Sequence, residues 1–192
     1  MSTSSVPGEG KTTQSLALAQ NLAGLDKKVL LVEGDVRKRV FAEYFGIKNE
    51  NGLIAVLQGD SALDEAVVFQ DVLQTDVLMS ERPRSNAADI FSSQAFKDFL
   101  NDARDIYDYI VIDTPPVLAV PDARIIGKLV DATIYTVRWD FTTQRQVTEG
   151  LKSLANVRVP VTGLVLGQVD LKGQKKYGYG EGIGFYGSYH EN

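Results

Sequence analysis

The stretch SSVPGEGKTT, residues 4–13, governs how the rest of the chain is interpreted. A glycine-rich segment that ends in Gly10-Lys11-Thr12 is typical of a loop that holds phosphate groups between a buried strand and a helix. Gly8 and Gly10 let backbone N–H groups approach phosphate oxygens, and a helix that starts near Lys11 would add its positive N-terminus. Ser5 replaces the glycine that normally stands five residues before Gly10, so the motif is a variant.

Each part of this loop has an expected role. Lys11 would contact the outer phosphates, Thr12 would offer its hydroxyl to Mg²⁺, and Thr13 would add a hydrogen bond to phosphate. The alternative is an ordinary glycine-containing helix start without a ligand. The residues predicted to bind the phosphates are Ser5, Val6, Pro7, Gly8, Glu9, Gly10, Lys11, Thr12 and Thr13.

Acidic residues follow two apolar runs that have the character of buried strands. Asp113 closes the run 109–112, and Glu33 and Asp35 follow the run 29–32. The carboxyl ends of parallel strands meet at the sheet edge where such folds bind ligands. We therefore predict a metal site in which Thr12, Glu33 and Asp113 hold Mg²⁺. The alternative is that an acid at a strand end is a turn residue.

The remaining chain alternates short apolar runs with helical periods. Strands are expected at 29–32, 77–79, 109–113, 133–137 and 162–166, and helices at 12–25, 92–105, 121–129 and 142–156. This alternation is typical of a parallel sheet covered on both faces. The predicted fold class is α/β, a P-loop NTPase with a mostly parallel sheet and helices on both faces. No strand-like run precedes the loop, so we expect the fold to lack its first strand.

Composition excludes several classes of protein. With 192 residues, 44% of them hydrophobic, the chain can bury one domain. A net charge of −5 without a basic tract disfavours nucleic acid as a partner. The chain has no cysteine and a single histidine, His190, which excludes thiolate sites and weakens histidine-based chemistry. Glycine and tyrosine replace apolar residues from 172 onward, so we expect a P-loop domain, 1–171, and a flexible tail, 172–192.

Three segments together resemble one protein family. SSVPGEGKTT (4–13), VLLVEGDVRKR (29–39) and YDYIVIDTPPV (107–117), followed by a tyrosine-rich tail, are similar to the bacterial tyrosine kinases of capsule and exopolysaccharide synthesis. Those kinases are cytoplasmic domains of polysaccharide co-polymerases. The resemblance covers nearly the whole chain and implies a kinase domain that binds ATP and Mg²⁺ in a P-loop fold.

The resemblance also implies roles for single residues and partners. Lys11, Asp35 and Asp113 would be catalytic, with Asp35 accepting or orienting the proton of a tyrosine hydroxyl. Arg37 would hold phosphate or a subunit contact, the alternative being a solvated cation. Phosphate would pass in trans to the tail of another copy, at Tyr177, Tyr179, Tyr186 and Tyr189. A transmembrane co-polymerase segment, in the same chain or a partner chain, would place the domain at the inner face of the bacterial inner membrane.

The chain departs from the family pattern in three places. Glu33 stands where Asp is usual, Gly167 replaces an Asn expected near the nucleotide base, and the first strand with an upstream assembly helix is not recognised. We therefore expect an N-terminally shortened chain, because a missing central strand would expose two strand edges. Two alternatives remain: a partitioning-type P-loop ATPase switch, whose second lysine would stand at Val6, and a nucleotide-binding regulator without catalysis.

Overall fold

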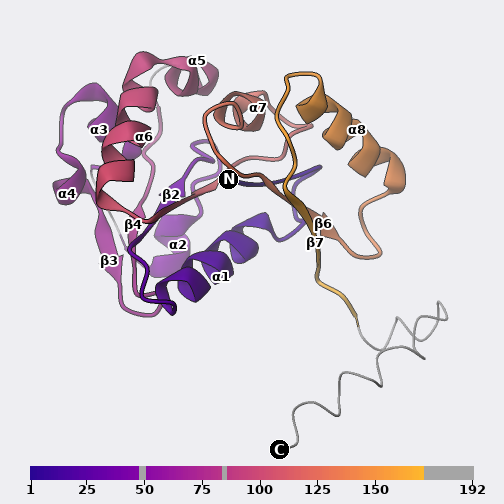
Figure 1. Cartoon of the computed structure of the whole chain (residues 1–192), viewed down its shortest axis with the longest axis horizontal. Coiled ribbons are helices and arrows are strands. Elements are labelled where there is room, and N and C mark those ends of the chain that lie inside the picture. Colours follow the sequence, from indigo (N-terminus) through magenta and orange to yellow (C-terminus); the bar gives the residue numbers. More distant parts are fainter. Residues whose placement is uncertain (48–50, 84–85, 171–192) are drawn as a thin grey trace, which may run out of the picture.

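The computed structural model describes residues 1–47, 51–83 and 86–170, and within them seven strands form one sheet (Figure 1). The strand order is β3-β4-β2-β5-β1-β6-β7, and every neighbouring pair is parallel except β3 and β4. The strands are β1 (Ser2–Ser4), β2 (Val29–Glu33), β3 (Val68–Gln70), β4 (Thr75–Leu78), β5 (Tyr109–Asp113), β6 (Ile134–Arg138) and β7 (Gly163–Gly167). The helices are α1 (Lys11–Ala23), α2 (Phe41–Phe45), α3 (Leu53–Gln58), α4 (Leu63–Ala66), α5 (Ala87–Ser92), α6 (Gln94–Ile106), α7 (Asp122–Ile126) and α8 (Gln144–Ala155).

Helices cover both faces of the sheet, as the alternation of the sequence predicts. On one face, Leu31 packs with Ala19 of α1 and Phe41 of α2. On the other face, Val32 and Phe96 belong to a larger core that also takes in buried side chains of α3, α5, α7 and α8. The successive residues Leu31 and Val32 thus point to opposite faces, which is the period of a strand buried on both sides. The predicted α/β fold class is confirmed.

The long helices begin where a side chain can cap them. Ser93 accepts the backbone N–H of Phe96 at the start of α6, and Thr143 accepts that of Gln146 at the start of α8. Such caps satisfy N–H groups that have no partner inside the helix. Both helices therefore start two residues later than the hydrophobic pattern predicts.

The expectation that the first strand is missing is wrong. Ser2, Thr3 and Ser4 form β1, which lies between β5 and β6 inside the sheet. All three residues are at most 1% exposed. Their hydroxyls donate to backbone carbonyl oxygens, at Lys11, Pro115 and Val6 respectively, so burial leaves no unpaired hydroxyl. The hydrophobic pattern does not reveal this strand because its residues are polar. Since the strand is present, its supposed absence no longer supports the expectation of a shortened chain.

The sheet positions the phosphate-binding loop and the acidic residues at one edge. The loop runs from the end of β1 to the start of α1, while Glu33 and Asp113 are register partners at the ends of β2 and β5. This is the carboxyl edge of the parallel strands, where ligands bind in folds of this class. Among the described residues, no helix combines the length and apolar character that crossing a bilayer requires.

Candidate active site

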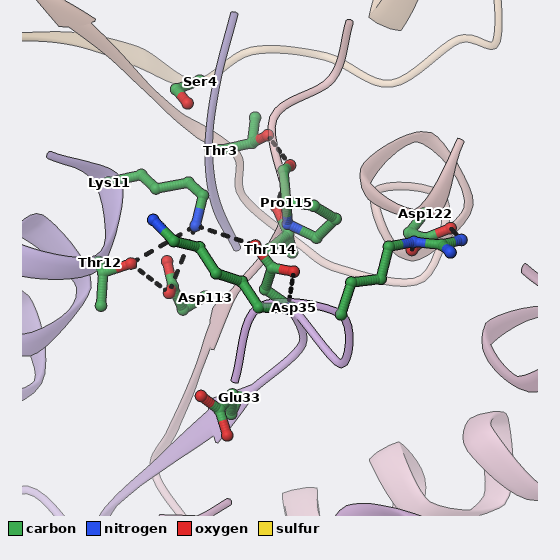
Figure 2. Close-up of polar contacts among 12 residues, drawn as sticks. Thr3, Ser4, Lys11, Thr12, Glu33, Asp35, Asp113, Thr114, Pro115 and Asp122 are labelled. Atoms are coloured by element: carbon green, nitrogen blue, oxygen red, sulfur yellow. Dashed lines mark hydrogen bonds and ion pairs between the residues drawn. The ribbon is translucent and has the colours of Figure 1, made fainter. Parts of the chain in front are cut away.

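Four predicted site residues converge at the carboxyl edge of the sheet (Figure 2). The Nζ of Lys11 lies 3.6 Å from Asp35 Oδ2 and 3.6 Å from Asp113 Oδ2. The hydroxyl of Thr12 donates to Asp113 Oδ2 at 2.7 Å. The three charged side chains are at most 10% exposed, so solvent screens their interactions weakly. One buried ammonium group is therefore shared by two carboxylates, one at the end of β5 and the other in the loop that follows β2.

Asp113 is held in a polar setting beneath the loop. Its Oδ1 lies 3.1 Å from the hydroxyl of Ser15 on α1, and its Oδ2 accepts from Thr12. Burial raises the pKa of the Asp113 carboxyl, and the positive charge of Lys11 and the two hydroxyl groups oppose that rise. The Asp113 carboxylate is thus stabilised by the ammonium group of Lys11 and by two hydroxyl groups. A second cation, such as a metal ion, would stabilise its negative charge further.

The loop itself has the geometry of a phosphate cradle. Gly8 and Gly10 have φ angles of +84° and +88°, a left-handed conformation that side chains rarely adopt. Gly10 is the residue before α1, so the helix N-terminus opens directly onto the loop. A pocket of about 400 Å³ lies above it, and its lining includes the loop from Pro7 to Thr13 without Glu9, together with Asp35, Arg37, Tyr44 and Gln168.

Glu9, predicted to bind phosphate, points away from the pocket into the protein. It is fully buried, its Oε2 accepts the backbone N–H of Val6 at 2.6 Å, and its Oε1 accepts the hydroxyl of Thr142 at 2.5 Å. Thr142 also accepts the backbone N–H of Arg138 at the end of β6. The carboxylate therefore fastens the loop to the segment between β6 and α8. This orientation keeps the negative charge of Glu9 out of the pocket.

Two further side chains hold the loop from outside, and sequence patterns did not single them out. Arg138 donates to the carbonyl oxygen of Gly8 at 3.2 Å, and Gln168 donates to the same oxygen at 3.4 Å. Gln168 follows Gly167, the position expected to lie near the nucleotide base, and it lines the pocket. The sequence does show that Gln168 follows the last apolar strand. That Gln168 lies near Gly8, however, depends on the order of strands in the sheet, which the sequence pattern does not reveal.

Glu33 does not join the cluster, contrary to its predicted place in the metal site. Its Oε1 accepts the backbone N–H of Phe41 at 2.8 Å, and its Oε2 accepts that of Ser80 at 3.0 Å. Both oxygens are thus engaged with the start of α2 and with the segment after β4, and Figure 2 shows the carboxylate apart from Lys11 and Thr12. The geometry gives Glu33 a structural role, and we leave it out of the metal site.

Arg37 is not a freely solvated cation. Its Nε lies 3.3 Å from Asp122 Oδ2, and Asp122 is fully buried while the arginine side chain is 46% exposed. The buried acid at the start of α7 was not singled out by sequence patterns. It holds the guanidinium group of an arginine that also lines the pocket above the loop. The four predicted phosphate acceptors, Tyr177, Tyr179, Tyr186 and Tyr189, lie outside the described residues.

The fold and the loop together define a P-loop nucleotide-binding domain. Residues 5–158 match the family model described as AAA domain, which covers most of the chain. Structures of the same fold include the MinC:MinD cell division complex of Aquifex aeolicus, with 21% identity, a TM-score of 0.75, and coverage of 91% of this chain and 70% of that chain. At that identity the likeness shows the fold alone.

Other relatives are similar in sequence as well as in fold. The tyrosine-protein kinase YwqD of Bacillus subtilis is 35% identical over 93% of this chain and 76% of its own length. The tyrosine-protein kinase etk of Escherichia coli K12 is 31% identical over 93% of this chain and 25% of its own length. The VpsO kinase domain superposes with a TM-score of 0.84 at 36% identity, covering 88% of this chain and 84% of that chain. The chain therefore belongs to the bacterial tyrosine kinase family, and the predicted resemblance is confirmed.

Proposed function

We propose that this chain is an ATP- and Mg²⁺-dependent autokinase whose acceptors are the tail tyrosines of another copy, Tyr177, Tyr179, Tyr186 and Tyr189. The observation that supports the proposal most strongly is the convergence of Lys11, Thr12, Asp35 and Asp113 beside a loop shaped for phosphate. Phosphoryl transfer needs mainly positioning and charge neutralisation, and these four residues can supply both.

The nucleotide would be held by its phosphates. The backbone N–H groups of the loop and the N-terminus of α1 would face the phosphate oxygens, and Lys11 would turn toward the outer phosphates from its place between two acids. Thr12 and Asp113 offer a hydroxyl and a carboxylate oxygen that lie 2.7 Å apart, which is the oxygen donor set that suits Mg²⁺ beside phosphates. When bound, the ion supplies positive charge that neutralises the transferring group.

Asp35 is the proposed proton acceptor. It lines the pocket, is 5% exposed, and its Oδ1 accepts the backbone N–H of Lys38 at 3.1 Å, so its orientation is fixed. As the tyrosine oxygen bonds to the γ-phosphorus, the hydroxyl proton would pass to this carboxylate and ADP would leave with the electrons of the broken P–O bond. The carboxylate lies close enough to Lys11 for its negative charge to be stabilised before the proton arrives.

The tyrosines of the folded part differ in how well they could compete as acceptors. Tyr107 and Tyr135 are at most 7% exposed, and their hydroxyls pair with Asp76 and Ser5. Burial raises the pKa of both phenols, which opposes loss of the proton. Tyr109 is 44% exposed, and Tyr44 is 57% exposed. A map of phosphorylation should therefore follow all exposed tyrosines as well as those of the tail.

The wider setting of the domain is part of the proposal. The chain spans three quarters of the Bacillus subtilis relative and one quarter of the Escherichia coli relative, so relatives differ in what accompanies this domain. The resemblance to capsule and exopolysaccharide kinases supports a role in controlling polysaccharide synthesis. We place the domain at the cytoplasmic side of the inner membrane, attached to or paired with a transmembrane co-polymerase segment. Homo-oligomers would form when the region upstream of the domain, which carries the assembly helix of the family, is present.

The test is phosphate transfer by the purified chain, first treated with phosphatase. With ATP and Mg²⁺, mass spectrometry should find phosphotyrosine mainly within residues 177–189, and Lys11→Met should abolish both transfer and nucleotide binding measured by calorimetry. Circular dichroism of the variant controls for folding, because removing Lys11 leaves two buried acids without their cation. Undiminished ATP binding by a folded Lys11→Met variant would refute the site. ATP turnover without phosphotyrosine would indicate the ATPase switch, and binding without turnover would indicate the regulator.

A further inference from the structure

A second pocket adjoins the nucleotide pocket and is lined by arginine. It has a volume of about 490 Å³, and its wall consists of Val36, Arg37, Arg39, Arg82, Pro83, Asn86 and Ala87. Three arginines from two separate segments thus meet in one hollow on a chain whose net charge is −5. Asp122 balances the charge of Arg37, but like charges on Arg39 and Arg82 repel each other, and a bound anion would offset that repulsion.

Every polar side chain in this pocket offers hydrogen-bond donors. The side-chain oxygen of Asn86 already accepts the backbone N–H of Ala88, which leaves its NH₂ group free to donate. Among the residues that the structure describes, no acidic side chain lines the pocket and no carboxylate pairs with Arg39 or Arg82. Glu81, beside Arg82 in sequence, is engaged with backbone N–H groups at the start of α3. The pocket is therefore built to receive an anion.

Arg37 connects this pocket to the nucleotide pocket. It is one of the lining residues of both, and the buried carboxylate of Asp122 holds its Nε and one terminal nitrogen at 3.3 and 3.5 Å. Asp35, the proposed proton acceptor, is two residues earlier in the chain, and its backbone carbonyl accepts the N–H of Arg39 at 3.0 Å. An anion formed at the catalytic residues would thus lie next to the arginine pocket.

We propose that the arginine pocket binds the phosphoryl group of phosphotyrosine, the product of transfer in the adjoining site. Phosphotyrosine carries about −1.5 to −2 charges and three acceptor oxygens, which matches several arginine donors and one amide donor. The forked donors of arginine suit phosphate better than a point charge does. The source of the phosphotyrosine, a modified tail of this chain, rests on the proposed function. The pocket would hold a phosphorylated tail beside the catalytic residues and slow the exchange of one tail for the next.

The test uses synthetic peptides of residues 174–190, with and without phosphate on Tyr179, and the whole chain freed of phosphate by phosphatase. Fluorescence anisotropy without ATP should show that the phosphopeptide binds at least roughly tenfold more tightly than the plain peptide. The double variant Arg39→Gln with Arg82→Gln should lose that preference. Arg145→Gln, at a site whose side chain is 86% exposed on α8, is the matched control and should keep it. Added salt should weaken the binding, because the arginines are exposed.

Three outcomes would overturn the proposal. Equal binding of both peptides, or a preference that survives the double variant, would show that the arginine pocket is not the site. Inorganic phosphate that binds as tightly as the phosphopeptide would assign the pocket to a free phosphate compound instead of phosphotyrosine. Because the assay needs no ATP turnover, such failures leave the kinase proposal untouched, and a kinase that fails to transfer phosphate would leave this binding result intact.

Discussion

The side chain of Lys11 lies between two acids that the same reaction would use differently. Asp113 would hold Mg²⁺ and Asp35 would take a proton, and both lie 3.6 Å from the same ammonium group. At that distance two charges interact by about 4 kcal/mol if the effective dielectric constant is near 20. Incoming phosphates would compete for Lys11 with both acids, so a metal ion beside Asp113 would release part of the lysine charge. Binding of nucleotide and of Mg²⁺ should therefore be coupled.

Replacing Asp113 by asparagine tests this coupling. Asp113→Asn keeps the shape and an acceptor for Thr12 but removes the charge that would attract the ion. We expect the gain in ATP affinity on adding Mg²⁺ to fall by roughly tenfold or more, because a hydrogen bond or contact to a charged group is worth about 1.5–3 kcal/mol. Calorimetry with Mg²⁺ and with EDTA measures both affinities. Equal losses with and without the ion would make Asp113 a structural residue.

Glu33 gives a prediction about pH. Burial raises the pKa of this carboxyl above its ordinary value of 4.5, against the two backbone N–H groups that lower it. Between the ordinary and the raised pKa the folded chain holds a proton that the unfolded chain has lost, so stability falls as pH rises through that window. Glu33→Gln should remove this decline, and should lower stability by about 1–3 kcal/mol because its NH₂ group faces an N–H donor.

Urea unfolding of both proteins across that pH range measures the effect. The advantage of the natural chain over Glu33→Gln should be largest at low pH and should shrink as pH rises. The variant should retain the Mg²⁺ dependence of ATP binding. A variant that loses the Mg²⁺ dependence but not stability would restore Glu33 to the metal site.

The positions of some site residues could be predicted from the sequence, because those residues directly follow a recognisable loop or strand. Lys11 and Thr12 follow a glycine loop, and Asp113 ends a strand, so their meeting at one edge could be predicted. Glu33 ends a strand in the same way, but its partners at residues 41 and 80 come from distant turns that no pattern reveals. The buried Asp122 was missed for the same reason, because its partner Arg37 lies 85 residues earlier.

At the scale of elements, the loop is supported by the segment that connects β6 to α8. Thr142 donates to the buried carboxylate of Glu9, which in turn accepts from Val6, and Arg138 contacts the carbonyl of Gly8. The loop conformation therefore depends on contacts that span about 130 positions of sequence. A glycine loop without such support would lose more entropy when it closes on phosphate.

Removal of one hydroxyl tests this support. Thr142→Val keeps the side-chain shape but leaves one oxygen of Glu9 without its donor. We expect stability to fall by about 1–3 kcal/mol, and the KM for ATP to rise more than kcat falls, because the change affects how the loop closes rather than the acids. Thr148→Val, at an exposed position of α8, is the matched control. An unchanged KM in a destabilised Thr142→Val variant would limit the contact to folding.

The regular elements with apolar residues were predictable, and the polar or short ones were not. The strands at 29–33, 109–113 and 134–138 lie within about one residue of the predicted ranges. β1 was missed because Ser2, Thr3 and Ser4 have no hydrophobic signal, although backbone carbonyls satisfy each hydroxyl. The antiparallel strand β3 was missed as well, since three partly exposed residues show no clear period.

At the scale of the whole molecule, the route from the sheet toward the tail begins beside the active site. β7 ends at Gly167 on the same edge as the loop. The side chain of Gln168 donates to the carbonyl oxygen of Gly8, and Figure 1 shows the chain leaving the sheet at the end of β7. Tyr177 follows Gln168 by nine residues, which span at most about 30 Å when extended. Chain length alone therefore allows a tail to reach its own site or that of another copy. An experiment with two distinguishable copies separates transfer between copies from transfer within one copy.

A mixture of two variants measures this directly. One copy carries Lys11→Met and keeps its tail tyrosines, and the other keeps Lys11 while Tyr177, Tyr179, Tyr186 and Tyr189 are replaced by phenylalanine. Mass spectrometry after incubation with ATP and Mg²⁺ should find phosphotyrosine in the tail of the Lys11→Met copy, and none when that copy is incubated alone. Absence of tail phosphate in the mixture, while the second copy turns over ATP and the natural chain modifies its own tail, would contradict transfer between copies.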